Sequence, residues 1–180
     1  MSLRTRIFAL AALCLPLCLP ALARAANPQL RLPAFDHLQR TATESVNITL
    51  GPAPLALAAW VMKNEKGENA AARELLRGLR TIAVRSYEFP EDNMYSQADI
   101  DAVRDQLSAP GWTALARVRQ RHEDAEDVDI YVSMDNDKVT GLAIVAMSPR
   151  KFTIVNVVGS IDPSLLASLE DRLGLPALPM

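Results

Sequence analysis

The feature that most restricts the fold is a run of three β-type segments near the carboxyl end of the chain, joined by short polar turns. Apolar residues recur through Val128 to Met134, Lys138 to Met147 and Lys151 to Val158. The turns between them are Asp135-Asn136-Asp137 and Ser148-Pro149-Arg150. Because consecutive strands with turns this short must pair antiparallel, the pattern predicts a meander. Within its first strand we expect Ile130, Val132 and Met134 to face helices, and Asp129, Tyr131 and Ser133 to face solvent.

The preceding chain adds strands and helices to this meander. The segments ESVNITLG, TIAVRSYEFP and WTALARVRQRH alternate in hydropathy, which is typical of strands. The stretch from Pro52 to Arg80 predicts two helices separated by a polar break at Lys63 to Asn69. A third helix opens with Ser96 and Asp99 in capping-box spacing. A last one begins with Asp162 and Pro163 and ends at Gly174. The sum predicts one α+β domain over residues 26–180, with a short N-terminal arm and helices on one face of a mostly antiparallel sheet.

Residues 1–25 have the pattern of a secretory signal peptide. Arg4 and Arg6 precede an apolar run, which ends in Ala23-Arg24-Ala25. We therefore expect cleavage after Ala25, with a cut after Ala26 as the alternative, and a periplasmic mature protein. A membrane anchor is the competing interpretation, but the run is short for spanning and prolines interrupt it.

Both cysteines of the chain, Cys14 and Cys18, fall inside this leader. Leucine precedes each of them, where lipoprotein processing needs a small residue, so we expect a mature chain without cysteine or lipid. Cleavage also removes three arginines and changes the net charge from −2 to −5. An acidic chain without a basic block is a poor nucleic-acid binder, and we expect no stable membrane insertion after cleavage.

Asp135, Asn136 and Asp137 invite comparison with a calcium loop. Such a loop needs acids at alternate positions, a central glycine and a distal glutamate. Here the alternation fails at Val139, and Gly141 comes one position too late. The residues suit a hairpin turn, so we predict a turn and no metal site.

Arg117, Arg119 and Arg121 precede an acidic stretch, and their spacing aligns them on one strand face. They can form an anion site, or a solvated face neutralised by the acids. The sequence leaves both interpretations open.

Residues with catalytic potential are sparse and scattered. His37 and His122 lack a partner at motif spacing, and no nucleophile, metal-protease or phosphate-loop motif is present. The carboxylate pairs Glu91-Asp92 and Glu170-Asp171 are interpreted as surface acids, and Trp60 and Trp112 as core or rim packing. We assign no catalytic, cofactor-binding or metal residue and expect no cofactor.

Several stretches together resemble a family of exported bacterial proteins that is catalogued only as a domain of unknown function. They are GLRTIAVRSYEF, the pair Gly111-Trp112 and VDIYVSMDNDKVTGLAIVAMSPRKFTIVNVVGSID, followed by a leucine-rich helix. The resemblance implies an α+β domain facing the periplasm or envelope. Similar proteins are often encoded beside sigma and anti-sigma factor genes, which implies a link to envelope signalling. Several relatives resemble lipoproteins, whereas this chain lacks a usable lipid-attachment cysteine.

The leading hypothesis is a soluble, periplasmic, non-enzymatic protein that binds a protein or small ligand in the envelope. The alternative is an enzyme of unrecognised type, a hydrolase using carboxylates and His122. An enzyme should gather these groups around one deep pocket. A binding module should instead show an apolar or charged patch with scattered ionisable groups.

Overall fold

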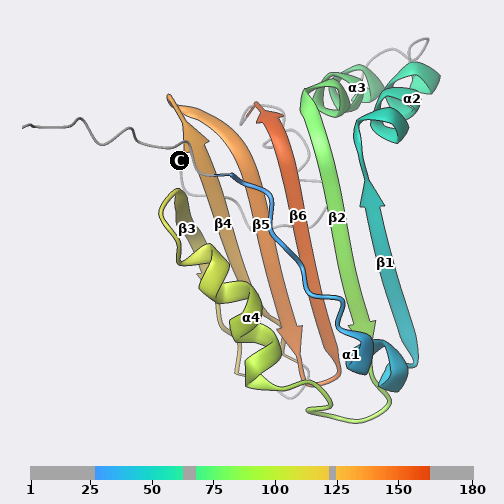
Figure 1. Ribbon diagram of the computed structural model, residues 1–180, viewed down its shortest axis with the longest axis vertical. Helices are drawn as coiled ribbons and strands as arrows, with labels where there is room; N and C mark the ends of the chain where they lie inside the picture. The colour runs from blue at the N-terminus through green and yellow to red at the C-terminus, as the bar shows by residue number, and fades with distance from the viewer. Residues whose placement is uncertain (1–26, 63–67, 122–124, 163–180) are drawn as a thin grey trace, which may run out of the picture.

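The computed structural model describes residues 27–62, 68–121 and 125–162, which form a six-stranded antiparallel sheet with helices around it (Figure 1). In spatial order the strands are β1, β2, β6, β5, β4 and β3. Their bounds are Glu44–Leu50 for β1, Leu79–Glu88 for β2, Trp112–Val118 for β3, Asp127–Asp135 for β4, Lys138–Ser148 for β5 and Lys151–Ile161 for β6. The predicted α+β class with an antiparallel sheet is confirmed.

Strands β3 to β6 are neighbours in space in the order in which they follow in the chain, so the predicted meander is present. The turn between β4 and β5 consists of Asn136 and Asp137, whose φ angles are 47° and 62°. This left-handed geometry matches the twist of a two-residue hairpin, and short polar side chains tolerate it. The prediction of a turn at Asp135 to Asp137 is therefore confirmed.

The helices are α1 (Asp36–Thr41), α2 (Pro52–Val61), α3 (Glu68–Gly78) and α4 (Gln97–Leu107). Helix α4 begins with the predicted capping box. The Ser96 hydroxyl accepts a hydrogen bond from the Asp99 N–H, and the Asp99 carboxylate accepts one from the Ser96 N–H. These bonds satisfy backbone donors that have no partner within the helix.

Helices α1 and α4 and the arm of residues 27–35 cover one face of the sheet, called the first face (Figure 1). Aromatic rings dominate its core. The fully buried ring of Phe152 lies 5.2 Å from that of Tyr95 and 6.0 Å from that of Phe35. From α4, Val103 and Leu107 are buried in the same cluster. The first face is thus a closed hydrophobic core.

The arm is fastened to the first face by Asn156 of β6, whose side chain is 1% exposed. Its Oδ1 accepts a hydrogen bond from the Leu30 N–H at 3.0 Å, and its Nδ2 donates to the Pro28 carbonyl at 3.1 Å. Gly141 of β5 lies beneath Pro28, and a Cβ there would collide with the proline ring. The glycine therefore makes room for the start of the arm.

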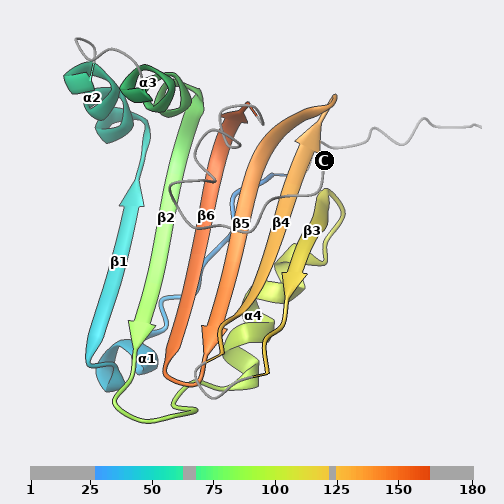
Figure 2. The same ribbon diagram turned by 180° about the vertical axis from the view of Figure 1, so that it is seen from behind.

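A second cluster lies on the opposite, second face of the sheet, at the end where α2 and α3 pack (Figure 2). Leu55 of α2 is 2% exposed and belongs to it together with Leu79 and Ile161. Leu75 and Leu76 of α3 pack against this cluster, as do Leu50, Ile82, Leu115, Leu142 and Val157 from the strands. The helices therefore form two groups, one over the first face and one at an end of the second.

For β4 the expected solvent-facing side is wrong, whereas Val132 lies as expected in a cluster with helix residues. Tyr131 belongs to the first-face cluster under α4, and Asp129 on the same side is bonded by Arg104 of α4. The side expected to face solvent is buried: the exposed fractions are 1% for Asp129, 5% for Tyr131 and 2% for Ser133. On the second face, the exposed fractions are 4% for Ile130 and 9% for Val132, but 53% for Met134. Because both faces of β4 are covered, the alternation of residue types does not reveal which face carries helices.

Strand β3 also departs from the expected regular alternation. Its pairing with β4 shifts between Ala114 and Ala116, which leaves Leu115 as a bulge. Leu115 packs toward the second cluster, and the side chains beyond it change face. Four predicted features lie outside the described residues: the leader, the last helix, Glu170-Asp171 and His122.

Candidate functional site

Helix α2 is apolar around its whole circumference. Gly51 precedes it, Pro52 fits its first turn, and its sequence PAPLALAAWV contains no charged residue. Only Leu55 and Ala59, one helical turn apart, are buried against the rest of the molecule. A helix that is apolar all round is normally enclosed by protein or lipid, and α2 is enclosed on one side only.

The opposite side of α2 presents large apolar side chains to solvent. Leu57, Trp60 and Val61 are 61%, 61% and 62% exposed. Their spacing of three and four residues aligns them on one stripe, which Ala53 extends by a turn. We call Ala53, Leu57, Trp60 and Val61 the α2 patch. Contiguous exposed apolar side chains of this kind mark interaction sites.

A groove between α2 and α3 borders the patch. Its volume is about 430 Å³, and it is lined by Pro52, Ala56, Ala59, Trp60, Leu76, Arg77 and Leu79. Trp60 belongs to both patch and groove, so the two form one apolar surface with a single cationic side chain, Arg77, at its border. Such a surface can hold an apolar side chain of another molecule, and Arg77 can bond a carbonyl or carboxylate beside it.

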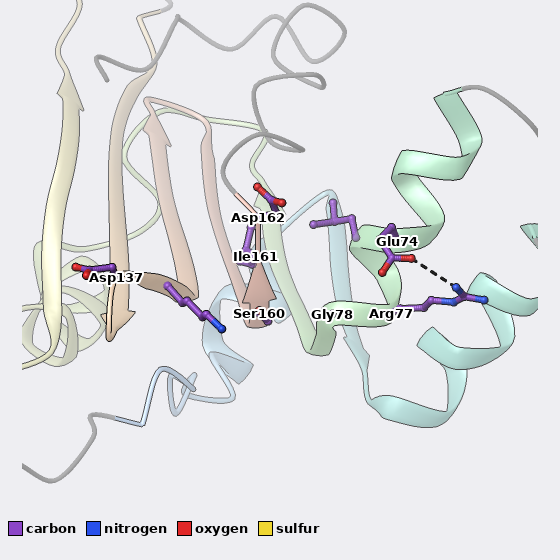
Figure 3. Close-up of a pocket in the computed structure, with 9 residues that line it drawn as sticks. Glu74, Arg77, Gly78, Asp137, Ser160, Ile161 and Asp162 are labelled. Atoms are coloured by element: carbon purple, nitrogen blue, oxygen red, sulfur yellow. Dashed lines mark hydrogen bonds and ion pairs between the residues drawn. The ribbon is translucent and has the colours of Figure 1, made fainter.

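On the other side of α3 lies a charged hollow of about 420 Å³ (Figure 3). Glu74 and Arg77 come from α3, Asp137 and Lys138 from the β4–β5 hairpin, and Asp162 follows β6. The Arg77–Glu74 pair spans 3.5 Å between two exposed side chains, so it contributes little to stability. Gly78 lies against the Ser160 carbonyl, with no room for a Cβ between them, so α3 packs closely on β6. Its charged side chains are all exposed and of both signs, so the hollow can bind a polar or charged group.

A second charged site lies on the first face, where Arg104 of α4 meets Asp129 of β4. Asp129 accepts hydrogen bonds from Arg104 Nη2 at 2.6 Å and from Arg119 Nη2 at 2.5 Å. A carboxylate can be buried only with such partners, because an unpaired buried charge is very costly. The two guanidinium groups line a hollow of about 390 Å³ together with Tyr95 and Asp127. Burial raises the pKa of Tyr95, and the nearby Asp127 charge adds to this shift.

Of the three arginines for which the sequence left an anion site and a neutralised face open, one is paired with acids. Arg119 is engaged by Asp129 and, at 3.5 Å, by Asp127. Arg117 and Arg121 are exposed. The structure instead brings Arg104, from α4, beside Arg119. Sequence spacing cannot reveal this pairing, because it joins residues of different elements across the buried Asp129.

His37 has a partner that local sequence did not show. Its Nε2 lies 2.8 Å from Asp99 Oδ1, and the Ser96 hydroxyl bonds the other carboxylate oxygen at 2.7 Å. Burial alone would raise the pKa of Asp99, but the bonds from Ser96 and His37 hold it below its ordinary value. Because the serine bonds Asp99 and not the histidine, the three groups fasten α1 to α4 and do not activate a nucleophile.

The remaining predicted residues are dispersed. Asp92 pairs with Arg150 at 2.7 Å on the surface, and Trp112 packs against the first-face core. Within residues 27–62, 68–121 and 125–162, no three histidine or acidic side chains come together in a way that can hold a metal ion. Among the same residues, no helix has the length and apolar character needed to cross a membrane. Sequence analysis missed the α2 patch: the uncharged run PAPLALAAWV predicts an apolar helix, but Trp60, expected in core or rim packing, is 61% exposed.

A family model described as a domain of unknown function (DUF4252) matches residues 40–169. The match spans all six strands of the described sheet and α2, α3 and α4, and it begins after the arm, near the end of α1. No curated protein and no solved structure matches the chain.

Proposed function

The chain belongs to the DUF4252 family, and we propose that it is a non-enzymatic interaction protein of the cell envelope that docks a partner protein on helix α2. The observation that carries the proposal is the exposure of the α2 patch. Leu57, Trp60 and Val61 are each more than 60% exposed on a helix without charges. Fully burying one such side chain contributes about 1.5–3 kcal/mol. The chain forgoes this stabilisation when it stands alone.

A protein groove suits the patch better than a lipid surface. Helices that lie in the membrane interface carry a polar face rich in lysine and arginine, which α2 lacks. Its ten residues are also too few to span a bilayer. An apolar stripe at helical spacing matches the helix-in-groove mode of protein recognition, with Leu57 and Trp60 as anchors.

The described ionisable side chains support binding rather than hydrolysis. Asp129 is held by two arginines, Asp99 by Ser96 and His37, and Asp92 by Arg150. Each of these carboxylates is engaged by its own structural partner. A hydrolase needs an acid and a base that converge on one substrate site.

The proposed location in the cell envelope is inferred from the leader, residues 1–25. Arg4, Arg6 and Ala23-Arg24-Ala25 support export, and the resemblance to exported proteins supports a role in the envelope, with signalling as its context. Mass spectrometry of the protein from a periplasmic fraction should give an N-terminus at Ala26 or Asn27. An intact Met1 would contradict export.

The docking proposal is tested by affinity capture from periplasmic extract with three forms of the mature protein. We expect one partner to be retained by the wild type and lost from a Leu57→Glu, Trp60→Glu variant, because charges cannot enter an apolar groove. Met134→Glu is the control: it changes an apolar residue near the β4–β5 hairpin that is 53% exposed. Equal retention by all three forms would contradict docking on α2.

A spectroscopic readout then tests direct contact with the captured partner. The chain contains two tryptophans, so Trp112→Phe leaves Trp60 as the sole indole. Its emission should move to shorter wavelength when the purified partner is added and water leaves the ring. No change with a partner that binds would place the contact elsewhere, and a change with lipid vesicles alone would favour a membrane surface.

A further inference from the structure

The sheet has two edge strands, β1 and β3, which differ in how they are protected. An edge strand offers unpaired N–H and C=O groups, and natural proteins shield these with bulges and charged side chains. Strand β3 has both, the bulge at Leu115 and the exposed guanidinium of Arg117. Strand β1 pairs with β2 over seven residues without a register shift, and the only charged residue among them is the first, Glu44. Strand β1 is therefore the unprotected edge.

The outer side of β1 is open in the described part of the molecule (Figure 1, Figure 2). No described strand pairs with it there, and no described helix runs alongside it. Its side chains are accessible as well: Ile48 is 42% exposed, and Ser45, Asn47 and Thr49 are exposed. An extended segment of another chain can therefore reach this edge.

One side chain shows which backbone groups of β1 point outward. Arg85 of β2 donates from the same Nη1 atom to the carbonyls of Ile48 and Val84, at 2.9 and 3.0 Å. These two residues are opposite each other in the register, so their carbonyls can share one donor only if both point into the space between β1 and β2. Backbone groups alternate in direction along a strand. The N–H and C=O groups that point away from β2 are therefore those of Ser45, Asn47 and Thr49.

We propose that β1 pairs with β1 of a second copy of the chain, antiparallel and centred on Asn47, so that two sheets join into one. A twofold axis through Asn47 brings residues of the same face opposite each other, because side chains alternate with a period of two. Val46 then lies opposite Ile48 of the second copy, apolar against apolar, and Ser45 lies opposite Thr49. Pairs of these kinds stabilise a sheet, and no two like charges are opposed.

The outward backbone groups suit a second copy in particular. With Asn47 on the axis, each of Ser45, Asn47 and Thr49 donates one hydrogen bond to the other strand and accepts one from it. An unrelated strand needs a matching order of apolar and polar residues, whereas a second copy supplies that order by symmetry. The contact involves seven residues of each chain, which is small for an interface, so we expect a dimer that dissociates on dilution.

Sedimentation velocity of the mature protein over a range of concentrations tests the proposal. The mean mass of the wild type should rise with concentration toward that of two chains. Asn47→Lys should remain monomeric, because two lysines then face each other on the axis, while the exposed side chain leaves the fold unchanged. Met134→Lys is the control: it adds the same charge at an exposed position away from β1 and should dimerise like the wild type.

Two results of this measurement would overturn the proposal. One is a wild type that stays monomeric up to the highest concentration at which it is soluble. The other is a dimer that persists in Asn47→Lys, above all one that Leu57→Glu with Trp60→Glu dissociates, since the copies would then meet through α2. Asn47→Lys should still retain the partner captured on α2, so the proposed function and the proposed dimer can fail separately.

The register of the pairing is tested by cysteine cross-linking, since both native cysteines lie in residues 1–25. With a short bismaleimide, Asn47→Cys should link to its own copy, because the axis places the two Cα atoms about 5.5 Å apart. Glu44→Cys is the matched control on the same strand. It lies three residues from the axis, so its copy is about 20 Å away and should not be linked. Equal yields from the two variants, or no link from Asn47→Cys, would contradict a pairing centred on Asn47.

Discussion

On the first face of the sheet, Phe152 is fully buried between aromatic rings, while on helix α2 Trp60 is 61% exposed. Both regions are rich in large apolar side chains, but the first face buries nearly all of them, whereas α2 buries Leu55 and Ala59 and exposes Leu57, Trp60 and Val61. The first face also pairs its buried polar groups: Asn156, for example, bonds the arm. The difference separates side chains that stabilise the fold from side chains that remain exposed to solvent. Substitutions should therefore affect stability in one region and binding in the other.

The largest loss of stability is expected from charged substitutions in the middle of the sheet. Val132→Asp and Ser133→Asp each place a carboxylate in a buried position, on opposite faces of β4. We expect each to lower the free energy of unfolding by more than about 3 kcal/mol, because neither charge finds a partner. Urea unfolding measures both, with exposed Met134→Asp as the control that stays within about 1 kcal/mol. A mild effect of Ser133→Asp alone would show that the first face is open at this position.

A similar loss is expected at the buried carboxylate. Asp129→Ala leaves the guanidinium groups of Arg104 and Arg119 without their common partner. We expect a cost of about 3 kcal/mol, since removing one member of a buried pair strands its partner charge. Asp92→Ala, which breaks the exposed pair with Arg150, should cost at most about 1 kcal/mol. If the two variants unfold at the same urea concentration, the ion pairs of Asp129 with Arg104 and Arg119 do not stabilise the fold more than an exposed pair does.

A smaller, pH-dependent effect is expected where α1 meets α4. The pKa of Asp99 is lower in the folded protein than its ordinary value, so the folded state favours the ionised carboxylate. Its contribution is complete above the ordinary carboxyl range and is lost as the pH falls through the depressed pKa. Asp99→Asn should cost about 1 kcal/mol at neutral pH, the usual value of such a cap.

The pH dependence supplies the check. Thermal unfolding of the wild type should show a loss of stability in acid that is reduced in Asp99→Asn. Asp105→Asn, an exposed residue of the same helix, should leave the acid profile of the wild type unchanged. If Asp99→Asn loses stability in acid to the same extent as the wild type, Asp99 is not the group responsible for that loss.

The smallest effect is expected on α2. Leu57→Gln should change the free energy of unfolding by no more than about 0.5 kcal/mol, because its side chain is exposed. The same substitution in the buried stripe, Leu55→Gln, should cost several times more. If Leu57→Gln destabilises as strongly as Leu55→Gln, the exposed side of α2 serves folding, and the contrast between the two regions disappears.

The sheet was predictable because its signals are local. Two-residue turns, alternating hydropathy and the Ser96–Asp99 capping box each occupy a few neighbouring residues, and the structure contains all of them. The faces of β4 were not predictable. In the sequence, Asp129 cannot be told from a solvent-facing aspartate. Its burial depends on Arg104 and Arg119, which precede it by 25 and 10 residues and reach it only in the folded chain.

The candidate site was missed for a related reason. An apolar helix predicts burial, and only the tertiary arrangement shows that α2 packs at the end of the sheet with one side outward. His37 and Asp99 are 62 residues apart, so their pairing also depends on the folded arrangement. Local patterns thus predict elements, while exposure and long-range partners require the three-dimensional structure.

The attachment of the arm has a consequence for the order of events during synthesis. Leu30 is among the first residues of the described chain to be made, and its anchor Asn156 follows 126 residues later. Strand β2 likewise obtains its second neighbour, β6, only when the last strand is complete. The arm, β1 and β2 therefore complete their packing only after β6 has been made, so the first face closes late in synthesis.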